Sequence, residues 1–242
     1  MTTVQMGRAM ERLLPLGAPA DGAWVAEPAV REALAEAART VRGTVPARPR
    51  FGLVSAAAET PFPVPPGGLP PGELGITLEF AAFTGGPAAA GRPLPELAGR
   101  LRTALLGAAE SVFGLAVARV DLRVTELLDT PPDPVSPTPP PGRTSPPAPE
   151  DPAALAALAV PGVAALTDVF GAPLRRADGH LRVELAVTAG RRALDVARAA
   201  RTAVSPAPPE ATTVTVVVSE LRYASGPPPP GAPRGSPSPQ SP

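Results

Sequence analysis

Alternation of apolar and polar residues marks strands in both halves of the chain. From Leu74 to Phe83 most apolar side chains occupy every second position, and the same alternation returns from Leu181 to Thr188. Successive side chains of a strand point to opposite faces, so each stretch predicts a strand with one apolar face. Further apolar stretches predict strands over 51–57, 117–127, 163–170 and 212–221.

Apolar residues at helical spacing lie between these strands. They recur every three or four positions from Leu94 to Val112, before Gly114, and a second helix is predicted over 193–204. Two more helices are predicted to begin at Glu27-Pro28 and Asp151-Pro152. Proline suits the first helical turn, because its missing N–H would have no partner there.

The two halves repeat the same order of predicted elements: helix, strand, strand, helix, strand. Two short motifs recur in matching places, Leu78-Glu79-Phe80-Ala81 with Val183-Glu184-Leu185-Ala186, and Val124-Thr125-Glu126-Leu127 with Val218-Ser219-Glu220-Leu221. We therefore expect an α+β fold of two repeated units, 22–128 and 151–223, packed pseudo-symmetrically.

Proline accounts for 38 of the 242 residues and clusters in a few segments. The cluster in 129–150 predicts a semi-rigid polyproline linker, and the Pro/Gly/Ser-rich segment 224–242 predicts a disordered tail. Residues 1–21 are expected to be irregular.

Only 3% of the residues are aromatic, so each core is built from Leu, Val and Ala. Such thin cores favour packing of the units together or onto a partner.

Charge and cysteine content exclude several classes of function. The 22 basic residues, all arginine, balance 22 acidic residues, which argues against bulk electrostatic binding to nucleic acid or anionic membranes. There is no cysteine, which excludes disulfides and thiolate chemistry. Residues 1–10 lack the apolar region of a secretory signal, and the uncharged stretch 152–167 is too short to span a bilayer. We expect a cytoplasmic protein that contacts membranes only through a partner.

Groups with catalytic chemistry are few. His180 is the only histidine, so one chain cannot build a His dyad or a multi-His metal site, and its place beside the Asp178-Gly179 turn favours a surface histidine. The segment 86–93 lies where a phosphate loop would lie, but it lacks the required Lys and Ser/Thr. A flexible connector explains it better. We expect no catalytic residue, no cofactor and no metal.

Charged residues at strand ends and in loops are the remaining candidates for interaction. Glu126 and Glu220 occupy equivalent strand ends, where pseudo-symmetric packing would bring their carboxylates together and raise their pKa values. The alternative is that each turns to solvent or pairs with an arginine. Two arginine pairs flank the predicted strand 181–188, where they would bind a phosphate or an acidic segment, or remain solvated: Arg175, Arg176, Arg191 and Arg192.

Several segments resemble a known family. Gly22-Ala23-Trp24-Val25, followed by a helix ending at Val41-x-Gly43, resembles the opening of the alkaline-shock, or envelope stress response, family of Gram-positive bacteria. Residues 183–204 and 214–221 resemble its strand–loop–helix and its closing strand. The chain also resembles actinobacterial proteins that carry the name of a nucleopolyhedrovirus p-ten family, a label without chemical content. The first resemblance implies small α/β domains that self-associate or bind a membrane-anchored partner, with no catalytic residues.

Together these observations predict a non-enzymatic protein-interaction or scaffolding module, linked to the envelope stress response. The alternative is a small-ligand-binding protein or an enzyme, with its site between the two units. A third hypothesis, nucleic-acid binding through an arginine edge, is weakened by the balanced charge.

Overall fold

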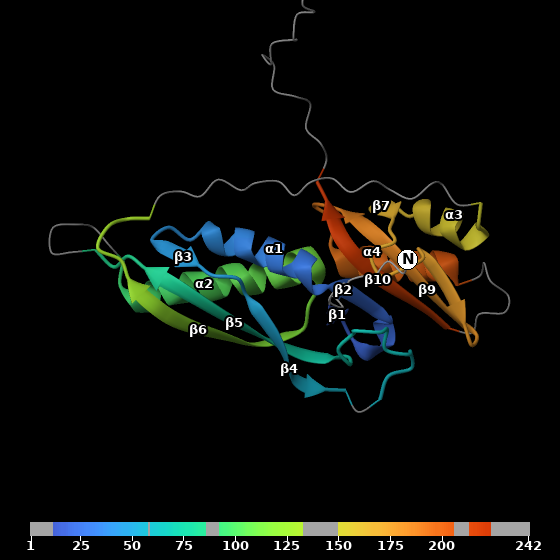
Figure 1. Ribbon diagram of the computed structural model, residues 1–242, viewed down its shortest axis with the longest axis horizontal. Helices are drawn as coiled ribbons and strands as arrows, with labels where there is room; N and C mark the ends of the chain where they lie inside the picture. The colour runs from blue at the N-terminus through green and yellow to red at the C-terminus, as the bar shows by residue number, and fades with distance from the viewer. Residues whose placement is uncertain (1–11, 58, 86–91, 133–149, 206–212, 224–242) are drawn as a thin grey trace, which may run out of the picture.

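The computed structural model describes residues 12–57, 59–85, 92–132, 150–205 and 213–223. In this part of the chain four α-helices and two β-sheets form an α+β fold, which confirms the predicted class (Figure 1). The predicted tail 224–242 lies outside the described residues, as do most of the predicted linker 129–150 and of the connector 86–93.

The first sheet is built on β5 (Gly72–Ala82), an eleven-residue strand whose inward side chains are apolar. β6 (Val117–Leu127) pairs with it in parallel along residues 74–82. β3 (Thr44–Pro46) and β4 (Arg50–Ala56) pair antiparallel with the two ends of β5. Because β6 takes one edge of β5 along this length, β3 and β4 share the other edge.

Two helices pack on the apolar face of this sheet (Figure 1). α1 (Glu27–Arg39) buries Val30, Leu34 and Ala38, which recur at helical spacing. α2 (Leu94–Ala108) buries a leucine stripe and continues into a π-helical turn, η2 (Ala109–Phe113). The turn ends at Gly114, whose φ of 79° is a left-handed conformation that glycine adopts without strain.

The second sheet is built on two parallel strands, β9 (His180–Thr188) and β10 (Thr213–Arg222). β7 (Val163–Leu166) and β8 (Leu174–Ala177) pair antiparallel with the two ends of the other edge of β9. The predicted turn at Asp178-Gly179 joins β8 to β9, and both residues have positive φ, 51° and 71°. Such a two-residue turn matches the twist of a hairpin. α3 (Pro152–Leu158) and α4 (Ala193–Val204) cover the apolar face, as predicted.

An N-terminal hairpin joins this second sheet. β1 (Leu13–Leu16) pairs antiparallel with β2 (Ala23–Ala26), a short 3₁₀ turn, η1 (Pro19–Asp21), connects them, and β2 pairs in parallel with β10. Over residues 12–21 the structure thus differs from the expectation that residues 1–21 are irregular. β2, at the start of the predicted first unit, belongs to the second sheet. β10 is buried on both faces from Val214 to Ser219, as is typical of a central strand with neighbours on both edges.

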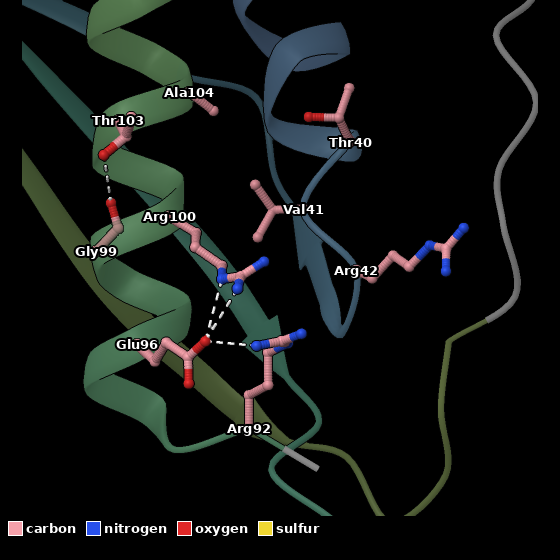
Figure 2. Close-up of a pocket in the computed structure, with 9 residues that line it drawn as sticks. All are labelled: Thr40, Val41, Arg42, Arg92, Glu96, Gly99, Arg100, Thr103 and Ala104. Atoms are coloured by element: carbon pink, nitrogen blue, oxygen red, sulfur yellow. Dashed lines mark hydrogen bonds and ion pairs between the residues drawn. The ribbon is translucent and has the colours of Figure 1, made fainter. Parts of the chain in front are cut away.

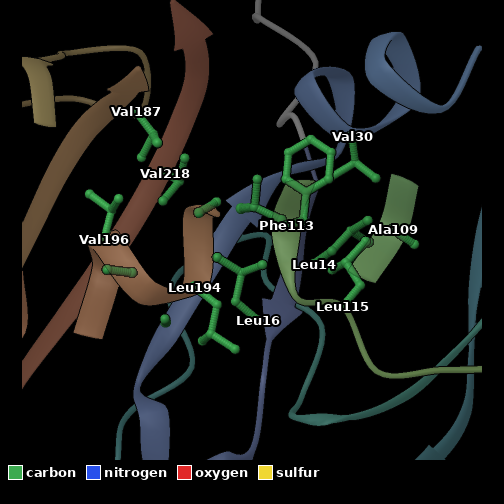
Figure 3. Close-up of a cluster of buried hydrophobic side chains, with 14 of the residues drawn as sticks. Leu14, Leu16, Val30, Ala109, Phe113, Leu115, Val187, Leu194, Val196 and Val218 are labelled. Atoms are coloured by element: carbon green, nitrogen blue, oxygen red, sulfur yellow. The ribbon is translucent and has the colours of Figure 1, made fainter. Parts of the chain in front are cut away.

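A single hydrophobic core runs through both halves of the chain. Figure 3 shows the junction, where Leu14 and Leu16 of β1 lie among three side chains: Phe113 of η2, Leu115 in the loop after it, and Leu194 of α4. All of these side chains are 3% exposed or less. The segments 22–128 and 151–223 therefore share one core and do not bury two separate ones.

The proline-rich segment 59–71, here called the proline loop, lies against the opposite face of the second sheet. The N–H of Leu13 donates to Gly67 O (3.0 Å), and the N–H of Leu69 donates to Leu13 O (2.9 Å). The indole N–H of Trp24 donates to Leu69 O at 3.0 Å. A loop of the first half thus covers the second face of this sheet, where its Phe62 packs against the cluster of Trp24 and Val217.

Candidate functional site

The arginine pairs predicted as one basic edge are separated in the structure. Arg176 pairs with Asp151 at 2.8 Å, and Arg192 pairs with both Glu110 and Asp195. Arg191 is exposed in the loop between β9 and α4, whereas Arg175 is exposed on β8. Two of the four arginines thus tie elements of the fold together, and Arg175 lines a cavity on the second sheet.

The two candidate glutamates lie in different sheets. Glu126 is exposed on β6 of the first sheet. Glu220 lies on β10 of the second sheet and pairs with Arg222 at 2.8 Å. The predicted approach of the two carboxylates does not occur, because β6 and β10 are not neighbours in one sheet. The alternatives of solvation and arginine pairing describe them instead.

A cavity of about 160 Å³ lies between the proline loop and the second sheet. Its wall on the sheet side is polar and carries the side chains of His180, Arg182 and Thr215, with Arg175 and Ala177 from β8. Its other wall is apolar and is formed by the proline loop: Pro63, Val64, Pro65 and Pro66.

Arg182 is the buried cation of this cavity. Its side chain comes from β9, and the residue is only 6% exposed. Nη2 donates to Phe170 O at 3.0 Å, while Nε has no hydrogen-bond partner among the described residues. No carboxylate in the described part of the chain forms an ion pair with it. Burial lowers the pKa of Arg182, Glu184 opposes that effect, and Arg175 adds to it.

Glu184, two residues further along the same face of β9, is fully buried. Its carboxylate accepts hydrogen bonds from Val169 N (2.7 Å), Phe170 N (3.0 Å) and Thr167 Oγ1 (3.0 Å). Burial raises the pKa of Glu184, although these donors oppose the shift. The donors also explain why β7 ends before the predicted residue 170: two backbone N–H groups bind Glu184 and not a neighbouring strand.

His180 is half-buried, and not the surface histidine that its turn suggested. Nδ1 lies 2.7 Å from Thr213 Oγ1, and Nε2 lies 2.9 Å from Thr215 Oγ1. Burial lowers the pKa of His180, and the nearby charge of Arg182 lowers it further. The imidazole is therefore neutral at pH 7, and it holds β9 and β10 together at the rim of the cavity.

A wider and more open groove of about 830 Å³ lies between the end of α1 and the start of α2 (Figure 2). Arg42, Arg92 and Arg100 line it together with a single carboxylate, Glu96. Glu96 pairs with both Arg92 and Arg100, and the hydrogen bond from Arg92 is the main cause of its lowered pKa. Glu96 pairs with two of the three arginines but offsets only one of their charges. Arg92 and Arg100 are about half exposed, so water screens the charge that remains and the groove is a weaker anion site than a buried cation.

The outer edge of β6 is the third candidate. Among the described residues no strand pairs with this edge, and Figure 1 shows β6 along the border of the first sheet. β6 has eleven residues and no Pro or Gly. The other edge strands are shorter, at three to seven residues. β1 and β3 contain proline, and β4 contains a bulge. Short strands, proline and bulges blunt an edge. β6 has register shifts at Ala118 and Thr125, but the stretch between them is regular, and β6 is the longest of these strands and has no proline, so we regard it as the edge best suited to pairing.

The alternation of residues 181–188 places Arg182 and Glu184 on the polar side of a strand, which is correct, but it does not show what covers that side. The proline loop and the 167–171 turn cover it, and both are distant in sequence. A cluster of Arg, Glu, His and Thr on one strand face was the only local signal of a buried polar site.

In comparisons with family models, with curated proteins and with solved structures, no match to this chain is found. In the described part of the chain no helix has both the length and the hydropathy needed to cross a membrane. Nor do the described residues bring together three His, Cys, Asp or Glu side chains that would hold a metal ion.

Proposed function

We propose that this protein is a non-enzymatic interaction module that self-associates by pairing β6 with β6 of a second copy. The observation that carries the proposal is the open edge of β6, the longest edge of the two sheets in the described residues. Addition of a strand to such an edge is a common mode of protein recognition, because the backbone groups on the edge lack partners.

The proposal includes a duplicated unit, which strand register supports. Leu78 lies opposite Leu122 in the first sheet, and Val183 lies opposite Val216 in the second. These are the pairs that alignment of the two recurring motifs requires. A register shift follows at Thr125 in β6 and at Ser219 in β10, the same place in each motif. We therefore regard β6 and β10 as equivalent strands.

This equivalence explains why an added strand would fit. The edge of β10 is occupied by β2, which pairs with Val216, Val217 and Val218. The equivalent edge of β6, from Leu122 to Val124, has no such neighbour among the described residues. The same kind of edge thus already accepts a strand elsewhere in this chain.

The charges on β6 favour a second copy as the occupant. A two-fold pair of identical strands is antiparallel, and centring it on Leu122, the middle residue of β6, pairs residues 120–124, which lie between the two register shifts of the strand. In this register Asp121 lies opposite Arg123 of the second copy, twice, and Val120 lies opposite Val124. Opposite charges at such positions stabilise a strand pair, whereas like charges destabilise it. Centring one residue earlier would place Asp121 opposite itself.

The apolar side chains at the end of this strand support the same surface. Val124 is 41% exposed and Leu127 is 61% exposed, and both belong to the face that packs on the helices. In the paired register Val124 lies opposite Val120 of the second copy, and Leu127 lies beyond the register shift at Thr125. Pairing would therefore remove apolar area from water on one face while it joins charges on the other.

Sedimentation velocity over about a hundredfold range of concentration tests the proposal. We expect the 24.4 kDa chain to shift towards a dimer as concentration rises, and Val124→Lys to remain a monomer. The matched control is Val54→Lys, which changes a valine of similar exposure, 45%, on β4. A wild-type chain that stays monomeric, or equal losses in both variants, would refute the proposal.

We place this module in the cytoplasm, in the envelope stress response, with membrane contact made through a partner. The resemblance of residues 22–43 and 183–221 to the alkaline-shock family supports that setting. A fluorescent fusion that remains diffuse after envelope stress, in cells that hold the membrane-anchored partner, would count against it.

A further inference from the structure

We propose that the cavity between the proline loop and the second sheet binds a small organic carboxylate, whose negative charge lies against Arg182. This inference is independent of strand pairing at β6, because it uses different residues on the other sheet. It specifies the alternative function expected from the sequence, which is a small-ligand site between the two units.

The positive charge of the cavity is not balanced by an ion pair. Arg182 is 94% buried and its Nε has no hydrogen-bond partner among the described residues. The nearest candidate counter-ion, Glu184, is held by three other donors, at 2.7–3.0 Å, and forms no ion pair with it. Arg175 lines the same cavity and adds a second positive charge. Glu184 attracts Arg182 only through space. A buried cation without a direct ion pair is costly, so an anion that enters the cavity is stabilised there.

The two walls of the cavity differ in chemistry. A guanidinium binds a carboxylate through parallel N–H donors, and both Arg182 and Arg175 lie on the sheet side of the cavity. The opposite wall is the apolar surface of Val64 and the three prolines around it. A ligand that is anionic at one end and apolar at the other matches both walls, whereas inorganic phosphate matches only one.

The volume of the cavity suits a small ligand. The cavity measures about 160 Å³. A cavity needs only about 10–15 Å³ to hold one water molecule, so this one has room for a small molecule of a few non-hydrogen atoms. Propionate has that size. A fragment of this size binds weakly, with a dissociation constant in the millimolar range.

His180 provides a unique reporter for the test. It is the only histidine of the chain and lies on the rim of the cavity, so its imidazole resonances are assigned without ambiguity. Propionate is titrated into the full chain at constant pH and ionic strength, and propionamide, its uncharged equivalent, is titrated in parallel. We expect a saturable shift of the His180 resonances with propionate and none with propionamide.

Variants separate this site from a general effect of charge. Arg182→Gln should abolish the saturable shift, and Arg175→Gln, at an exposed position, should weaken propionate binding several-fold. Arg191→Gln, outside the cavity, should leave the titration unchanged. If Arg182→Gln does not fold, Arg175→Gln and propionamide still decide the question.

Three results would overturn the proposal: a shift that does not saturate, the same shift with propionamide, or saturation by inorganic phosphate but not by propionate. None of them bears on self-association, which the sedimentation experiment measures separately.

Discussion

Arg198 on α4 holds the carboxylate of Asp21, 177 positions earlier in the chain, through two hydrogen bonds. Nε donates to Oδ1 at 2.7 Å and Nη2 donates to Oδ2 at 2.9 Å. Asp21 also accepts the N–H of Ala18, at 2.7 Å, and so closes the turn between β1 and β2. This two-point contact fixes the N-terminal hairpin against the second half of the chain.

Replacement of Arg198 by Met should therefore destabilise the fold. We expect a loss of about 1–2 kcal/mol in the free energy of unfolding, because the hydrogen bonds are charged but Arg198 is half exposed to solvent. Urea denaturation followed by circular dichroism measures this loss. Arg191→Met, at an exposed position, is the matched control and should change stability little. Equal stability of the two variants would show that the contact contributes nothing.

Two carboxylates should give opposite pH dependence of stability. Burial alone would raise the pKa of Asp21, but the hydrogen bonds from Arg198 and Ala18 outweigh it and the pKa is lowered. Asp21 then stabilises the fold above its unfolded pKa of about 3.9, and this contribution is lost as pH falls through the lower folded value. Burial raises the pKa of Glu184. Its contribution is present below the unfolded value of about 4.3 and is lost as pH rises through the folded value.

The measurement is urea denaturation of wild type, Asp21→Asn and Glu184→Gln between about pH 3 and pH 8. The stability advantage of wild type over Asp21→Asn should grow with rising pH. Its advantage over Glu184→Gln should shrink with rising pH. Parallel curves for wild type and Glu184→Gln would mean that Glu184 does not titrate differently in the folded state.

Replacement by alanine should have opposite effects on the free energy of unfolding at Gly107 and at Gly114. Gly114 has a φ of 79°, and an added Cβ would lie 2.8 Å from Cβ of Leu194, at the junction of the two halves. Gly114→Ala should lower the free energy of unfolding by more than about 2 kcal/mol. Gly107 lies in α2, and an added Cβ would have no atom within 4 Å. Gly107→Ala should raise stability by about 0.5–1 kcal/mol. Thermal unfolding of both variants tests the pair, and a stable Gly114→Ala would contradict the close packing of this junction.

Local sequence signals predicted most elements of the fold. Alternation placed β5 and β9, helical spacing placed α2 and α4, and the Asp178-Gly179 turn formed where it was expected. These features depend on neighbouring residues alone. The proline at the first helical turn also located the start of α1 and of α3.

Long-range pairing could not be predicted in the same way. The valines of β10 indicated a buried strand, but nothing local shows that Trp24 and Val25 lie beside it. Likewise, the polar alternation of β9 correctly placed Arg182 and Glu184 on one face. Only the proline loop, more than a hundred residues away in sequence, turns that face into a buried site.

Self-association through β6 is tested most directly by exchanging its two central charges. Asp121→Arg would place arginines opposite each other in the paired strands, and Arg123→Asp would place two carboxylates opposite each other. The double variant Asp121→Arg/Arg123→Asp restores opposite charges. Sedimentation equilibrium of all four chains, with circular dichroism as a check of folding, measures their association constants.

We predict that each single variant dimerises about tenfold or more weakly than wild type, and that the double variant recovers most of this loss. If the folded double variant is as weak as the single variants, or if all four chains associate equally, β6 does not pair with itself.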